Sequence, residues 1–170
     1  DNSLQIASPQ EDGSERLPAR EAELRVVQEA LARFEAEGNQ LRAARDAAEK
    51  KRSDRAKEED CEKDQITNNW KNEQSSIWKG YIPTSKKPYP EMQRRNLQKE
   101  KALREKMNAM FEKSRKRTEL IIDEYNKSLA LANAKDAEIA AARIDLKKAQ
   151  DALAKAQEVL SQSHNKLIDK

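Results

Sequence analysis

Apolar residues recur every seventh position over the second half of the chain. Nine of eleven such positions are apolar, and they fall in one uninterrupted register: Leu97, Arg104, Phe111, Thr118, Tyr125, Ala132, Ile139, Leu146, Leu153, Leu160 and Leu167. Positions three or four residues away add a second apolar row: Met107, Ile121, Ala142, Ala149 and Ala156. Such a stripe lies along one face of an α-helix and packs against another helix. The pattern therefore predicts a single helix over residues 91–170.

The first half of the chain carries a similar stripe. Its members are Leu24, Val27, Leu31, Phe34 and Leu41, in a stretch rich in Ala, Glu, Arg and Lys. This composition favours helix, and residues 20–79 contain no proline. The stripe thins to alanine and charged residues over 45–62, then resumes at Ile66, Trp70 and Ile77 one step out of phase. We expect a helix over residues 20–79 with a stutter, or a local change of partner, near its end.

Two stretches interrupt the helical pattern. Residues 80–90 (GYIPTSKKPYP) hold three prolines and a glycine, which end a helix. Residues 1–19 hold two prolines, a glycine and no repeat. The chain thus divides into a flexible leader or linker (1–19) and a hairpin (20–170), made of a helix (20–79), a tip loop (80–90) and a second helix (91–170).

The two stripes predict their own pairing, because a helix with an apolar face must cover it. Folding back at about residue 85 brings Leu31 near Ile139, and the acidic stretch 58–64 beside the basic stretch 106–117. The predicted fold class is all-α: a long antiparallel two-helix coiled-coil hairpin with an irregular tip loop rich in proline and aromatic residues. The second helix is the longer, so Leu153, Leu160 and Leu167 should overhang the first. The leader, a neighbouring domain or self-association through residues 150–170 would cover them, as expected of a segment of a longer protein.

Composition narrows the class of protein. Hydrophobic residues make up 36% of the chain and charged residues 38%, too little apolar material for a broad globular core. The strict period argues against disorder, and no apolar run is long enough to span a membrane. Cys61 is alone, so no internal disulfide can form.

Catalytic chemistry is not expected. The single histidine, His164, lies in a polar stretch, and the sequence holds no glycine-rich phosphate loop or nucleophile motif. A two-helix hairpin also lacks a water-excluding pocket. We therefore expect no catalytic residues, no metal site, no cofactor and no small-molecule substrate; the chain is not expected to be an enzyme.

Positive charge and aromatic residues gather around the tip loop. Residues 67–117 carry a net charge of +9, against −5 before them and −1 after them, and four of the seven aromatic residues lie between Trp70 and Tyr89. Aromatic and arginine side chains commonly anchor interfaces, and prolines lower the entropy cost of presenting them. The candidate partner-binding residues are Trp78, Lys79, Tyr81, Ile82, Lys86, Lys87, Tyr89 and Arg94. In a competing interpretation, the tryptophans and Ile77 form a small core that closes the turn.

Residues 20–170 combine two charged, alanine-rich helical stretches with an aromatic, proline-containing tip between them. The two stretches are AREAELRVVQEALARFEAEGNQLRAARDAAEKKR and AEIAAARIDLKKAQDALAKAQEVLSQ. This combination resembles the central receptor-binding coiled coil of colicin-type bacteriocins. That resemblance implies a protein receptor, an outer-membrane transporter of the target cell, and a secreted bacterial protein. Without the resemblance, a cytoplasmic location is expected.

Three other functions remain open on the residues alone. The hairpin could be a coiled-coil stalk or adaptor of a secretion apparatus or another assembly, or a plain spacer. It could also be a nucleic-acid-binding arm whose basic block contacts phosphates, with binding that weakens steeply as salt rises. Nucleic acid is the less favoured partner, because pairing with the acidic part of the first helix also explains the basic block.

Overall fold

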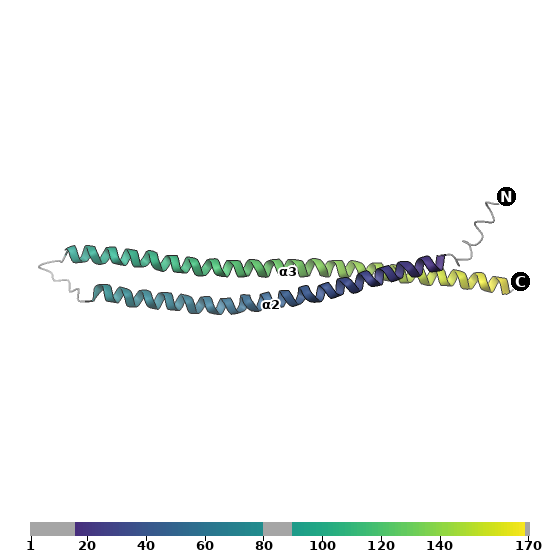
Figure 1. Ribbon diagram of the computed structural model, residues 1–170, viewed down its shortest axis with the longest axis horizontal. Helices are drawn as coiled ribbons and strands as arrows, with labels where there is room; N and C mark the ends of the chain where they lie inside the picture. Colours follow the sequence, from purple (N-terminus) through teal and green to yellow (C-terminus); the bar gives the residue numbers. More distant parts are fainter. Residues whose placement is uncertain (1–15, 80–89, 169–170) are drawn as a thin grey trace, which may run out of the picture. The chain divides into compact units, whose positions relative to one another are not determined.

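The computed structural model describes residues 16–79 and 90–168, which form two long helices (Figure 1). Helix α2 is Arg16–Trp78, 63 residues long, and helix α3 is Pro90–Ile168, 79 residues long. The described residues contain no strand. The expected all-α helical hairpin is confirmed.

The helix ends differ slightly from the sequence expectation. Helix α2 begins at Arg16, so residues 16–19, expected in the leader, are helical. Pro18 lies in the first turn, where its missing N–H removes no intrahelical bond. Helix α3 begins at Pro90 for the same reason, with Glu91 in its first turn, where a carboxylate complements the helix dipole. Residues 1–15 of the expected leader and 80–89 of the expected tip loop lie outside the described residues.

The described residues fall into two units, each containing part of both helices. Residues 16–44 and 129–168 make the first unit, and residues 45–78 and 90–128 make the second. Within the first, Glu35 pairs with Arg143 at 3.5 Å and Arg42 with Asp136 at 2.8 Å. Residue numbers rise along α2 as they fall along α3, so the helices run antiparallel.

The second unit has the same antiparallel arrangement. Lys51 pairs with Glu124 at 3.7 Å, and further along α2 the amide of Gln74 donates to Glu100 at 3.2 Å. In both units, therefore, α3 supplies the cover that the stripe on α2 requires.

The alignment of the two helices differs from the predicted one by about one heptad. Ile139 lies against Gly38, where an added Cβ would come within 2.8 Å of the Ile139 Cδ1 atom. The expected neighbour of Ile139, Leu31, is seven residues away along α2, so that prediction was wrong. A seven-residue repeat permits several alignments one heptad apart, and the missing side chain at Gly38 makes room for Ile139, which is only 4% exposed.

This alignment shortens the overhang at the end of α3. Ala152 lines a groove with residues of α2 and its neighbour Leu153 is half-buried, so the expectation that Leu153 extends past α2 was wrong. The end of α3 still extends past the start of α2 (Figure 1), and Leu167 and Ile168 at that end are 73% and 67% exposed. The overhang that suggested self-association through residues 150–170 is therefore shorter than predicted but remains.

The predicted uninterrupted register of α3 holds from Phe111 to Leu160 but fails nearer its start. Leu97 is 52% exposed and Arg104 is exposed, although both were expected in the stripe. The side chains that are buried or half-buried instead are Asn96, Glu100, Leu103, Met107 and Phe111. Two successive steps of four residues, from 103 to 107 and from 107 to 111, shift the stripe by one position.

Helix α2 contains a matching irregularity, which confirms the predicted stutter. Its inward positions step by four from Ile66 to Trp70 and again to Gln74. Ile66, Trp70 and Met107 line one shallow hollow, so the irregular steps of the two helices lie at the same level. Because both helices shift together, their stripes stay in contact through the stutter.

Aromatic side chains within the stripe are covered by long cationic ones. In the first unit, the Lys135 ammonium lies 5.0 Å from the centre of the Phe34 ring and 2.7 Å from the Glu37 carboxylate. In the second, the Arg52 guanidinium lies 4.3 Å from the centre of the Tyr125 ring. Charged residues thus contribute their stems and their cation–π attraction to the interface where apolar residues are few.

Candidate functional site

The end of α2 is attached to the first turns of α3 through one carboxylate. The indole Nε1 of Trp78 donates a hydrogen bond to Glu100 Oε2 at 3.0 Å, and Gln74 Nε2 donates to Glu100 Oε1 at 3.2 Å. Arg104 lies 3.6 Å from the same carboxylate, whose side chain is 16% exposed. The end of α2 is therefore held against α3 at Glu100, and this end of the hairpin is the candidate binding end.

Three of the eight predicted site residues are described. Lys79 and Arg94 are exposed, whereas Trp78 is half-buried and bonded to Glu100. The contact of Trp78 with α3 agrees with the interpretation in which it helps to close the end of the hairpin. The other predicted residues lie outside the described residues: Tyr81, Ile82, Lys86, Lys87 and Tyr89.

Sequence reasoning missed the polar residues that face inward at this end. Glu100 receives the bonds from α2, and Asn96 is only 4% exposed. The Asn96 Nδ2 and the Trp70 Nε1 are buried without a hydrogen-bond partner, which weakens the packing here. The stutter at Trp70 was the available signal, because a matching shift on α3 turns Asn96 and Glu100 inward in place of Leu97 and Arg104.

A second polar feature, the Arg55 cluster, occupies the stretch where the apolar stripe of α2 is thin. We define it as Arg55, Glu59 and Glu62 of α2 with Ser114 and Thr118 of α3. Arg55 is 2% exposed and forms two bonds with the Glu62 carboxylate, at 2.8 and 2.9 Å. It also donates to the Ser114 carbonyl at 3.0 Å and to Thr118 Oγ1 at 3.1 Å. Paired guanidinium–carboxylate bonds of this kind are strong and directional.

The hydroxyl groups of α3 complete the cluster. Ser114 Oγ donates to Glu62 at 2.7 Å, and Thr118 Oγ1 donates to Glu59 at 2.8 Å. The bond from Arg55, followed by that from Ser114, lowers the pKa of Glu62 from its ordinary value of 4.5 to about 2. The bond from Thr118 lowers the pKa of Glu59, and Glu62 in turn raises the pKa of Arg55. These polar atoms meet in one alignment only, so the cluster favours the observed register over those one heptad away.

The lowered pKa of Glu62 predicts an acid-sensitive hairpin. The folded state holds the ionised carboxylate, so its contribution is complete above about pH 4.5 and is lost as pH falls toward about 2. The melting temperature, followed by circular dichroism, should fall across this window. In the Glu62→Gln variant the fall should be smaller, because one carboxylate that must be protonated is gone. An unchanged pH dependence in that variant would show that Glu62 does not carry the effect.

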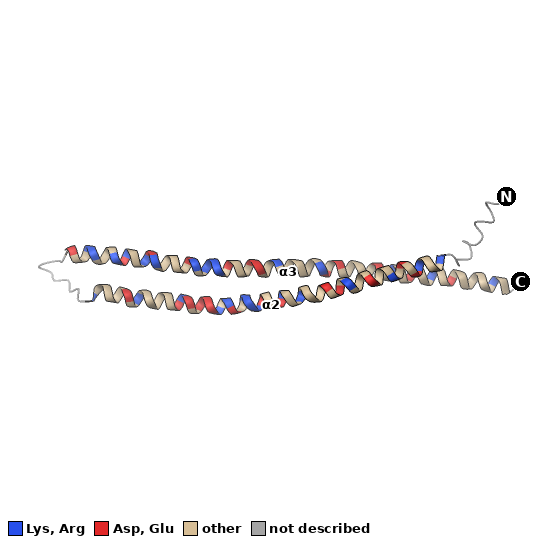
Figure 2. Ribbon diagram, in the orientation of Figure 1, with Lys and Arg blue, Asp and Glu red and all other residues tan. Residues whose placement is uncertain are grey.

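The basic block is only partly neutralised by α2. Arg117 pairs with Glu62 at 3.4 Å, but Arg115 pairs with Glu112 and Glu119 of its own helix. Figure 2 shows lysine and arginine along the first half of α3. Much of the positive charge of this stretch therefore stays at the surface, next to the candidate binding end.

The described residues contain no candidate metal site and no candidate membrane-spanning helix. Across residues 16–79 and 90–168, no three His, Cys, Asp or Glu side chains are grouped so that they could hold a metal ion. Neither described helix contains a stretch apolar enough to cross a membrane. Cys61 is exposed.

Comparisons with known proteins add no family to this picture. No family model, no curated protein and no solved structure matches the chain.

Proposed function

We propose that this hairpin is a non-catalytic binding module that presents residues 78–94 to a protein receptor. The observation that carries the proposal is the attachment of α2 to α3 at Glu100, which restrains the two helices between which this segment runs. A loop with fixed ends loses less conformational entropy on binding than a free one. The paired helices of the second unit provide the base that holds these ends in place.

The chemistry around the binding end suits a protein surface. Lys79 and Arg94 are exposed there, and Met92 and Leu97 leave apolar surface open, at 36% and 52% exposure. The sequence adds Tyr81, Ile82 and Tyr89 between them. Aromatic and aliphatic groups beside cations are typical of interface hot spots. The resemblance to colicin-type bacteriocins makes an outer-membrane protein of a bacterial cell the first receptor to test.

A nucleic-acid-binding arm is the second candidate, favoured by the surface charge along the first half of α3. The two candidates differ in their response to salt. Phosphate contacts release counterions, so binding weakens steeply with ionic strength, whereas a contact built on tyrosine and isoleucine depends on it less.

The tip prediction can be measured with vesicles made from bacterial outer membranes. The full chain should sediment with the vesicles, and the Tyr81→Ala/Tyr89→Ala variant should lose at least about tenfold in affinity, because aromatic anchors are often worth about 2 kcal/mol or more. Its helicity and melting temperature should stay unchanged. The matched control is Leu120→Ala, which removes an exposed apolar side chain (70%) away from the binding end and should bind normally.

Protease treatment of the vesicles should abolish binding if the receptor is a protein. Binding that survives the tyrosine substitutions would contradict the tip assignment. Tighter binding to duplex DNA than to vesicles, with a steep loss as salt rises, would favour the nucleic-acid arm instead.

A further inference from the structure

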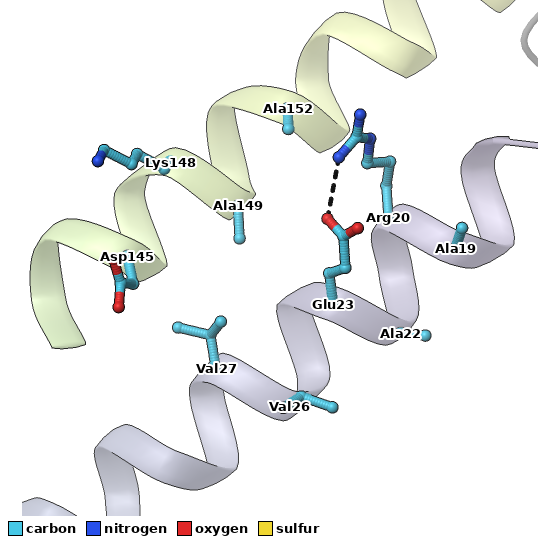
Figure 3. A pocket seen from close by; sticks show the side chains of 10 residues that line it. All are labelled: Ala19, Arg20, Ala22, Glu23, Val26, Val27, Asp145, Lys148, Ala149 and Ala152. Carbon is cyan, nitrogen blue, oxygen red and sulfur yellow. Dashed lines mark hydrogen bonds and ion pairs between the residues drawn. The ribbon is translucent and has the colours of Figure 1, made fainter.

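An open apolar groove lies between the helices of the first unit, near the start of α2 (Figure 3). Its volume is about 810 Å³. We call it the alanine groove, and its lining residues are Ala19, Arg20, Ala22, Glu23, Val26 and Val27 of α2 with Asp145, Lys148, Ala149 and Ala152 of α3. The alanines leave backbone close to the surface, so another helix could approach closely.

The groove remains open although an apolar side chain larger than alanine lines it. Val26 is 65% exposed. A pair of helices can bury only the side that each turns to the other, so its outer grooves stay uncovered unless further helices pack there. The alanine groove therefore has the shape and chemistry of a helix-packing surface.

The charges along the groove alternate in sign. Figure 3 shows Val27 directed toward α3 near Ala149, so Lys148 lies beyond Glu23 on the way along α2. Read in that direction, the order is Arg20, Glu23, Lys148 and Asp145, or plus, minus, plus, minus. The same series read backward is minus, plus, minus, plus. The four charged residues occupy four successive positions along the groove. If a second groove lies against the first in antiparallel orientation, each charge therefore has a charge of the other sign at the same position.

We infer that the alanine groove docks a second copy of this chain, with the two grooves face to face and the hairpins antiparallel about a two-fold axis. Self-complementarity of this kind is what an isologous interface requires. Within one copy, Arg20 and Glu23 form an exposed ion pair at 3.0 Å (Figure 3). In the dimer, Arg20 lies level with Asp145 of the other copy, and Glu23 lies level with Lys148. Four helices then enclose an apolar centre of alanine and valine, an arrangement known from antiparallel four-helix bundles.

Charge reversal tests this interface directly in the full chain. We expect sedimentation equilibrium to show a monomer–dimer equilibrium that weakens as salt rises. Arg20→Glu sets two acidic groups at one level, and Asp145→Arg sets two basic groups there. Each variant should weaken the dimer about tenfold, because symmetry repeats the change at two sites. An equimolar mixture of the two variants should recover the affinity, because the glutamate introduced in one copy then meets the arginine introduced in the other.

Circular dichroism provides the folding check, because the exposed substitutions should leave each hairpin helical. A chain that stays monomeric at all concentrations would overturn the proposal, as would a dimer that neither variant weakens or a mixture that does not recover. Removal of residues 1–15 is a further check. Dimerisation that appears only after this deletion would show that the leader, and not a second copy, occupies the groove in the full chain. The Tyr81→Ala/Tyr89→Ala variant should dimerise normally, which separates this test from that of the binding end.

Discussion

Replacing Arg55 with alanine should lower the free energy of unfolding by about 3–5 kcal/mol, the usual cost of removing one partner of a buried ion pair. The guanidinium is 2% exposed and bonds to Glu62, Ser114 and Thr118. Its loss removes two bonds to the Glu62 carboxylate and the bonds to two oxygen acceptors of α3, in a stretch of the interface that has few apolar contacts. Few other single substitutions in the described helices would remove as many cross-helix bonds.

Urea unfolding followed by circular dichroism measures this effect. The matched control is Arg115→Ala, since Arg115 is exposed and pairs with Glu112 and Glu119 of its own helix. Exposed pairs within one helix contribute little to stability, so the control should change it far less. Equal losses in the two variants would show that the Arg55 cluster does not hold the helices together.

A third variant separates the stability of the cluster from its specificity. Replacing Arg55 and Glu62 together with leucine removes both charges, so among the described residues the only ions that lose a partner are the exposed Arg117 and Glu58. Stability should then recover most of the loss seen in Arg55→Ala, because apolar side chains of similar size often replace buried ion pairs without net cost. The alignment of the helices should become less well defined, since neither leucine prefers Ser114 or Thr118 over positions one heptad away.

The fold class could be predicted because it depends on a repeat that extends over most of the chain. The seven-residue spacing from Phe111 to Leu160 determines which face of α3 is buried, whatever the partner. The cluster of prolines at 83, 88 and 90 then leaves one place for the chain to turn. Antiparallel pairing follows from these two features alone.

The alignment of the helices could not be predicted with the same security. Shifting one helix by seven residues keeps every apolar position facing the partner, so the stripe does not distinguish Leu31 from Gly38 as the neighbour of Ile139. What distinguishes them is local: the space at Gly38 and the bonds of Arg55. In the sequence, glycine at position 38 only interrupts the apolar stripe, and Arg55 is one of several charged residues where the stripe thins.

Composition alone predicted the location of the candidate binding end, but not the residues that hold it together. Aromatic and basic residues mark the segment, but the role of Glu100 as its anchor depends on a one-position shift of the stripe in α3. In a helix with many charged residues, the sequence does not show which of them faces the partner helix. The sequence shows the stutter at Trp70 in α2. The matching stutter in α3 can be inferred only when it is known which residues of α3 lie opposite Trp70.

The Ile139→Ala substitution should lower the free energy of unfolding by about 2–5 kcal/mol, the range for truncating a buried aliphatic side chain. Ile139 is 4% exposed and fills the space beside Gly38, which has no side chain of its own to close the cavity. Urea unfolding measures the loss. The control is Leu131→Ala in the same unit, because Leu131 is 58% exposed and should lose little.

Adding a methyl group at Gly38 distinguishes this packing from a general loss of apolar surface. In the original protein, Gly38→Ala gains about 1 kcal/mol of helix propensity, but its Cβ comes within 2.8 Å of the Ile139 Cδ1 atom, so overpacking offsets the gain. In the Ile139→Ala background that atom is absent, and the same substitution should raise stability by about 1 kcal/mol or more through propensity and partial filling of the cavity. A favourable coupling between the two changes would confirm that they meet across the interface. Purely additive effects would instead place Ile139 opposite another residue, as in the alignment one heptad away.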